Sequence, residues 1–251
     1  MNPLKRLLTA VAIGGAGLAA GGCALFGIPP INGAPQPGAP GPPTVEVNCP
    51  TDNLQNALDH AEPGSLIEVH GTCTGNFNIG VDDLVVVGNQ STAPTLQGAA
   101  VLDGGGGGGS VVRVNRDVTA TLISLTIEHG SGSGGGGGIN IPFGATVTLE
   151  ASQVTDNVVQ EDFGGGILND GTLYLNGSSV THNTDIGEDG GGIWNSGTAE
   201  LRGSTVSGNT STVSAGGIYN QGSVSLLESS VVTDNHPNNC GGVVPVAGCS
   251  G

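Results

Sequence analysis

The sequence predicts an all-β fold in which short strands wind into a coil of stacked turns. Two observations carry this prediction. Gly-Gly-aliphatic steps recur at intervals of 25–28 residues, and an asparagine follows each of the first four steps, each asparagine 26 residues after the last. A fixed period of this length indicates a repeat architecture in which each unit packs on its neighbours. The steps end at Ile139, Ile167, Ile193, Ile218 and Val243, and the asparagines are Asn157, Asn183, Asn209 and Asn235.

Each repeat has the composition of short strands joined by turns. Apolar and polar residues alternate over a few positions, as strands with one buried face require, and Gly, Ser, Asn and Asp supply the turns. Stacked turns align equivalent residues in columns, so we expect three inward aliphatic columns. We also expect the asparagines to form a ladder of amide hydrogen bonds, although each asparagine could instead only end a turn. The expected aliphatic columns are Val147, Leu173, Ala199; Leu149, Leu175, Leu201; and Val154, Val180, Val206, Val232.

The repeats resemble those of the right-handed parallel β-helix family. More narrowly, they resemble the Gly-Gly-Ala-Ile and Phe-x-x-Asn repeats of polymorphic outer-membrane proteins. The chain keeps Gly-Gly-Ile but replaces Phe by Val, as in Val154-x-x-Asn157. The resemblance covers about residues 64–245 and implies a solenoid of about seven turns. It says little about activity, because one scaffold hosts many functions.

The first 23 residues are typical of an export signal. After a basic start, the apolar run from Leu7 to Ala20 is too short to span a bilayer comfortably. The run leads into Gly-Gly-Cys23, which resembles a bacterial lipobox and predicts lipidation of Cys23; ordinary cleavage and secretion is the alternative. Residues 24–44, rich in proline and glycine, predict an extended spacer. The folded domain is then residues 45–251, anchored to a membrane of the bacterial cell envelope through the lipid.

Residues 45–73 are expected to cap the first turn of the coil. Thr51 is a good N-cap for a short helix that begins near Leu54 and ends before Pro63-Gly64. Leu66–His70 is expected to be the first strand. A cap is needed because an uncovered end turn is an unpaired strand edge. In an exported chain, cysteines at both ends predict two local disulfides. The predicted pairs are Cys49 with Cys73 and Cys240 with Cys249.

The composition restricts the partners. The chain has 5 Lys plus Arg against 21 Asp plus Glu, for a net charge of −16. Nucleic acid is excluded as an expected partner, because phosphate binding needs clustered cations. The same charge is expected to repel anionic polysaccharide unless Ca²⁺ bridges the two. The expected partners are a membrane, through the lipid anchor, and polysaccharide or surface proteins.

Two successive acidic loops are the first candidate for chemistry. Stacked carboxylates could hold Ca²⁺, and calcium is the only cofactor that the sequence suggests. Calcium-dependent pectate lyases share the expected fold and use such carboxylates beside a basic residue, but here no Lys or Arg aligns next to the loops. The alternative is a solvated acidic surface. The candidate ligands are Asp162, Asp185, Glu188 and Asp189.

Leu168, Trp194 and Tyr219 are the second candidate. Each follows an inward isoleucine, so all three should point outward, one above the next. Stacked outward aromatics offer an apolar strip that sugar rings could use, unless neighbouring loops cover them. We call these three residues the predicted glycan strip.

The position before each ladder asparagine is the third candidate. In this column His182 would lie one turn from Asp156, and a carboxylate beside a histidine can act as an acid–base pair. Turn positions favour aspartate in any case, which is the structural alternative. The column is His129, Asp156, His182, Gly208 and Asp234.

The sequence therefore predicts an exported, membrane-anchored and non-enzymatic β-helix that acts as a structural or adhesive module at the cell surface. No catalytic residue is assigned. Two alternatives use the same fold: a polysaccharide lyase or hydrolase, and a carbohydrate-binding module without catalysis.

Overall fold

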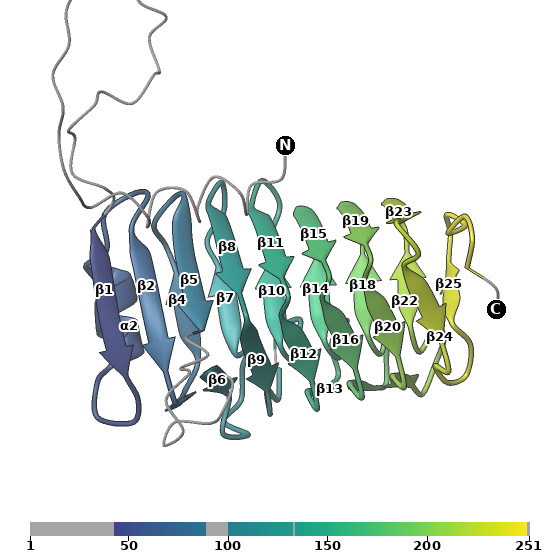
Figure 1. Ribbon diagram of the computed structural model, residues 1–251. Helices are drawn as coiled ribbons and strands as arrows, with labels where there is room; N and C mark the ends of the chain where they lie inside the picture. The colour runs from purple at the N-terminus through teal and green to yellow at the C-terminus, as the bar shows by residue number, and fades with distance from the viewer. Residues whose placement is uncertain (1–42, 89–99, 133, 250–251) are drawn as a thin grey trace, which may run out of the picture. The chain divides into compact units, whose positions relative to one another are not determined.

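A computed structural model describes residues 43–88, 100–132 and 134–249, which form a parallel β-solenoid of about seven turns (Figure 1). The predicted fold class is therefore confirmed. The predicted signal peptide, Cys23 and residues 24–42 of the predicted spacer lie outside the described residues. Among the described residues, no helix has the length and apolar character needed to span a bilayer.

Sheets A and B form two faces of the solenoid. Every strand pairs in parallel with the equivalent strand of the next turn. Sheet A comprises β1 (Thr44–Asn48), β2 (Leu66–His70), β5 (Leu84–Gly88), β8 (Thr119–Ile123), β11 (Thr146–Glu150), β15 (Thr172–Asn176), β19 (Thr198–Arg202) and β23 (Ser223–Leu227). Sheet B comprises β3 (Thr72–Thr74), β6 (Ala100–Asp103), β9 (Leu125–Glu128), β12 (Gln153–Thr155), β16 (Ser179–Thr181), β20 (Thr205–Ser207) and β24 (Val231–Thr233).

The Gly-Gly-aliphatic steps lead into a third sheet. Sheet C comprises β4 (Phe77–Ile79), β7 (Val112–Val114), β10 (Ile139–Ile141), β14 (Ile167–Asn169), β18 (Ile193–Asn195), β22 (Ile218–Asn220) and β25 (Cys240–Gly242). A short sheet D, present only in the later turns, comprises β13 (Val158–Gln160), β17 (Thr184–Ile186) and β21 (Thr210–Ser211).

The predicted aliphatic columns lie in the core. Val147 pairs with Leu173 and Leu173 with Ala199, and none of the three is more than 1% exposed. Burying a valine or leucine side chain contributes about 1.5–3 kcal/mol relative to exposure. Stacked aliphatics can therefore fill the interior of a chain with only 3% aromatic residues.

The predicted asparagine ladder is present. Nδ2 of Asn157 donates to Oδ1 of Asn183 at 2.9 Å, and equivalent bonds join Asn183 to Asn209 at 3.0 Å and Asn209 to Asn235 at 2.9 Å. Each of these accepting oxygens also takes the backbone N–H of the preceding asparagine. The first three side chains are fully buried. Buried amides are tolerated here because each has polar partners within the stack.

Two further polar columns were not anticipated. A second asparagine ladder joins Asn169 to Asn195 at 2.6 Å and Asn195 to Asn220 at 2.8 Å. Serine hydroxyls form the other, each accepting the backbone N–H of the preceding serine at 3.1 Å. The serines are Ser152, Ser178, Ser204 and Ser230. Both sets recur at the repeat period, so the signal was present in the sequence.

The N-terminal end differs from the prediction in two ways. Leu66–His70 is the second strand of sheet A, because β1 precedes it and pairs with it along its whole length. The capping helix α2 (Leu54–Asp59) has Asn53 as its N-cap, with Oδ1 accepting the N–H of Asn56 at 3.0 Å. The hydroxyl of Thr51, the predicted N-cap, instead donates to the backbone carbonyl oxygen of Asn48, three residues earlier in the chain.

The C-terminal end departs from the repeat period. Cys240, not Val243, pairs with Ile218, because the last turn is shorter than the preceding ones; Val243 is 77% exposed. The two predicted disulfides are confirmed. They join Cys49 to Cys73 and Cys240 to Cys249.

Candidate functional site

The outward face of sheet C carries one continuous column of side chains, the sheet C outer column. Each member occupies the middle position of a three-residue strand, next to a residue that faces the core, so the period of two turns it outward. The predicted glycan strip fills three consecutive positions. The column runs through Asn78, Arg113, Asn140, Leu168, Trp194, Tyr219 and Gly241.

Neighbouring loops cover part of the predicted glycan strip. Leu168 is only 9% exposed, because Gly135 lies directly against its side chain. Trp194 and Tyr219 are half-buried. The ring of Phe163 packs on Trp194 with centroids 5.1 Å apart, and the indole N–H has no hydrogen-bond partner among the described residues. The exposed apolar surface is therefore narrower than the sequence predicted.

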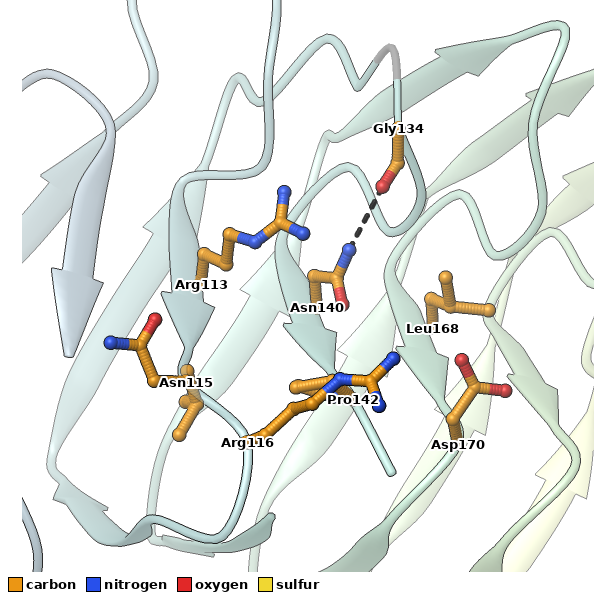
Figure 2. A pocket seen from close by; sticks show the side chains of 9 residues that line it. Arg113, Asn115, Arg116, Gly134, Asn140, Pro142, Leu168 and Asp170 are labelled. Atoms are coloured by element: carbon orange, nitrogen blue, oxygen red, sulfur yellow. Dashed lines mark hydrogen bonds between the residues drawn. The ribbon is translucent and has the colours of Figure 1, made fainter. Parts of the chain in front are cut away.

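A groove of about 310 Å³ continues the column toward earlier turns (Figure 2). Arg113 and Asn140 line it from β7 and β10, while Arg116 and Asp170 line it from the segments that follow β7 and β14. The Asn140 amide donates to the carbonyl oxygen of Gly134 at 2.9 Å, which fixes its orientation. The sequence reasoning missed this groove, because the strands that form it are less regular in sequence.

A second hollow of about 520 Å³ adjoins the first and shares Arg116, Pro142 and Asp170 with it. Phe143 lines this hollow and is 74% exposed. A phenylalanine this exposed offers an apolar face to a ligand. The two hollows and the half-buried aromatics together form an extended surface that carries both apolar and cationic groups.

The groove concentrates the positive charge of the described residues. Of the chain's five Lys and Arg residues, only Arg113, Arg116 and Arg202 are described. Nε of Arg202 lies 2.6 Å from Glu200, and its guanidinium also contacts Glu228 at 3.2 Å. Arg113 and Arg116 are exposed, and neither has a carboxylate of the described residues within 4.0 Å. Two unpaired guanidinium groups thus line one groove of a protein with a net charge of −16.

The structure does not bring the four predicted calcium ligands together. Within the described ranges, a single group of three or more His, Cys, Asp or Glu has its ligand atoms within 4.8 Å of one another, and it contains none of the four. The Asp162 carboxylate accepts the N–H of Gly134 at 2.7 Å and that of Phe163 at 2.9 Å. Asp162 therefore organises its loop.

Asp185 is fully buried in sheet D. The pKa of Asp185 is raised to about 7, chiefly by burial and also by the nearby Glu188 and Asp189, although hydrogen bonds from the backbone of Glu188 and Gly164 act to lower it. Its Oδ1 accepts the N–H of Glu188 at 3.0 Å, but its Oδ2 has no partner among the described residues. Burial and Glu188 also raise the pKa of Asp189. Burial beside other acidic side chains therefore favours the protonated form of both carboxyls.

The residues of the column that precedes the asparagine ladder share one backbone conformation. All five residues have φ between 55° and 67°, the left-handed region. Asp156 accepts the hydroxyl of Thr155 at 2.8 Å, and the His182 ring lies against Gly208. The described contacts include no hydrogen bond or ion pair between His182 and Asp156. The first member of the column, His129, contacts Asp103 instead, at 3.2 Å.

The comparisons with known proteins found no relative. No protein-family model, no curated protein and no solved structure matches the chain. The site is therefore interpreted from its own geometry and charge.

Proposed function

We propose that this protein is an exported, non-enzymatic adhesive module that binds glycans along the sheet C outer column and the two adjoining hollows. The observation that carries the proposal is the unpaired arginine pair, Arg113 and Arg116, in the groove that continues the Trp194–Tyr219 surface. Sugars present apolar ring faces and polar edges, and this surface offers partners for both.

The arginines favour a glycan that carries carboxylate groups. A guanidinium binds a carboxylate through two parallel hydrogen bonds, and it is more weakly hydrated than an ammonium group. The net charge of −16 opposes such a ligand at long range. Salt near 0.15 M screens interactions beyond about 8 Å. The attraction for a carboxylate in the groove therefore depends on the nearby arginines more than on the net charge. The exposed Phe143 and the half-buried Tyr219 supply stacking surfaces in later turns of the same surface.

Membrane anchoring belongs to the same proposal. The lipobox-like end of the leader supports lipidation at Cys23, and the proline-rich residues 24–44 would hold the domain away from the bilayer. The Gly-Gly-Ile and Val-x-x-Asn repeats support kinship with polymorphic outer-membrane-protein repeats. Metabolic labelling with a fatty acid tests the anchor: the parent should be labelled and a Cys23→Ala variant should not.

Binding to immobilised polygalacturonate and to a neutral glucan tests the proposed function. We expect the parent to prefer polygalacturonate, and Arg113→Gln and Arg116→Gln each to weaken that binding about tenfold, corresponding to about 1.4 kcal/mol. Arg202→Gln is the matched control, because Arg202 already pairs with Glu200 and Glu228 on sheet A. Its binding should be unchanged.

The same assay separates the alternatives. A parent that binds neither polymer, or an Arg202→Gln variant that weakens as much as Arg113→Gln, would contradict the proposed site. Neutral-glucan binding that depends on Trp194 would leave a carbohydrate-binding module without the acidic preference. Release of unsaturated oligosaccharides, detected by ultraviolet absorbance, would instead support the lyase alternative.

A further inference from the structure

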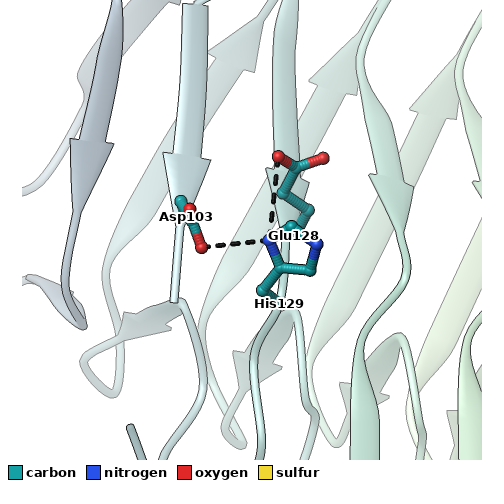
Figure 3. A group of neighbouring side chains, drawn as sticks. All are labelled: Asp103, Glu128 and His129. Carbon is teal, nitrogen blue, oxygen red and sulfur yellow. Dashed lines mark hydrogen bonds and ion pairs between the residues drawn. The ribbon is translucent and has the colours of Figure 1, made fainter. Parts of the chain in front are cut away.

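Asp103, Glu128 and His129 form a compact cluster on sheet B, a different sheet from the proposed glycan surface (Figure 3). Asp103 ends β6 and Glu128 ends β9, while His129 follows in a left-handed turn with φ of 56°. Nδ1 of His129 lies 3.2 Å from Oδ1 of Asp103 and 3.8 Å from Oε1 of Glu128. The side chains remain open to solvent, with 54% exposure for His129 and 24% and 25% for the two acids.

The two carboxylates interrupt a column of hydroxyl residues. Neighbouring strands lie about 4.8 Å apart, so like charges that stack directly repel each other and destabilise the sheet. The column is Thr74, Asp103, Glu128, Thr155, Thr181, Ser207 and Thr233. Threonine or serine occupies all the remaining positions of this column, so the fold does not require carboxylates at Asp103 and Glu128.

The described residues supply no permanent cation to this carboxylate pair. Arg202 is paired on sheet A, and Arg113 and Arg116 line the groove on sheet C. Within the cluster, only His129 can carry a positive charge. As neutral imidazole, a histidine becomes a metal ligand instead. Imidazole nitrogen and carboxylate oxygen, the donors present here, are both ligands of Zn²⁺ in proteins.

The donor separations match those around a small metal ion. With zinc–ligand bonds of about 2.0–2.2 Å in tetrahedral geometry, neighbouring donors lie about 3.3–3.6 Å apart, close to the 3.2 Å and 3.8 Å that separate His129 Nδ1 from the two carboxylates; all three donors lie within 4.8 Å of one another. The N–H of Gly105 donates to Oδ1 of Asp103 at 2.8 Å, which orients the carboxylate in the manner of an outer-shell partner. We propose that Asp103, Glu128 and His129 bind a divalent transition-metal ion of the Zn²⁺ type, with water completing the coordination.

The test is calorimetric titration of the full-length, chelator-treated protein with ZnCl₂ and, separately, with CaCl₂. The parent should bind Zn²⁺, and His129→Gln and Asp103→Asn should each weaken that binding at least tenfold. His182→Gln is the matched control, because His182 occupies the same left-handed turn two repeats later, where the neighbouring column holds threonines. Its Zn²⁺ affinity should equal that of the parent. Ca²⁺ should bind far more weakly, because it prefers oxygen ligands.

Three outcomes would overturn the proposal. They are a parent that binds no Zn²⁺, a His129→Gln variant with parental affinity, and a His182→Gln variant that loses as much affinity as His129→Gln. Circular dichroism and melting without metal establish that each variant is folded before titration. None of these outcomes affects the proposed glycan site, since its arginines line a separate groove beside sheet C.

Discussion

The asparagine ladder and the sheet C outer column are built by the same stacking but differ in what they repeat. The ladder places the same residue in four successive turns, and each buried amide finds its partner in the next. The outer column changes at almost every turn, from arginine through asparagine and leucine to two aromatics. In the four-asparagine ladder identity satisfies the amides internally, whereas variation along the outer column leaves groups available for a ligand.

Sheet D shows what happens when a buried column loses identity. Its inward positions are Val159, Asp185 and Ser211, and all three are buried. Neither neighbouring strand of sheet D has a carboxyl at the position that pairs with Asp185. One oxygen of the Asp185 carboxyl has no hydrogen-bond partner among the described residues. Burying a carboxyl without a full set of partners therefore carries a cost in free energy.

Breaking the ladder should have the largest effect on stability. Asn183→Ala removes the amide that donates to Asn209 and accepts from both the backbone and the side chain of Asn157. Each buried group left unsatisfied costs about 1–3 kcal/mol, so the expected loss is on the order of 3–5 kcal/mol. Urea denaturation monitored by circular dichroism measures it.

Asn176→Ala is the matched control for that variant. Asn176 lies on the same turn but is half-buried on the outward face of sheet A, so the expected change is within about 0.5 kcal/mol. Equal losses for Asn183→Ala and Asn176→Ala would show that the ladder has no special role in stability.

Replacing the buried Asp185 of sheet D should have a smaller effect on stability, and that effect should depend on pH. The unfolded Asp185 carboxyl titrates near 3.8, whereas its folded pKa is about 7. Between these values the unfolded state releases the proton and the folded state keeps it, so this group's contribution to stability falls as pH rises from about 4 to about 7. Above that range the contribution stays low.

The asparagine side chain in Asp185→Asn stays uncharged at every pH, so its contribution to stability should not fall between pH 4 and pH 7. The stability of this variant relative to the parent should rise between pH 4 and pH 8 by on the order of 2–4 kcal/mol. Asp234→Asn, which replaces an exposed carboxylate in a left-handed turn, controls for net charge. Urea midpoints across pH measure the effect, and parallel curves for Asp185→Asn and the parent would refute the buried-acid account.

The sequence was sufficient where the repeat was regular. The inward columns and the ladder follow from period alone, because parallel stacking aligns residues one repeat apart. The groove at Arg113 and the cluster at Asp103 were missed because the earlier turns vary in length, so the pairing of Asp103 with Glu128 could not be counted from the sequence. Leu168 was expected to point outward, but Gly135 covers it from another loop. The repeat period predicts which way a side chain points, and it does not predict which loops pack over that side chain.

The most direct test of the claim that the variable outer column is the binding surface compares the chain's two tyrosines. Tyr219 belongs to that column, whereas Tyr174 is equally half-buried on the outward face of sheet A, between Thr148 and Glu200. The affinity of each Tyr→Ala variant for polygalacturonate should be measured beside the parent. We expect a loss of about tenfold for Tyr219→Ala, of the size expected for an aromatic contact, and none for Tyr174→Ala. Equal affinities for both variants, or a loss confined to Tyr174→Ala, would contradict that claim.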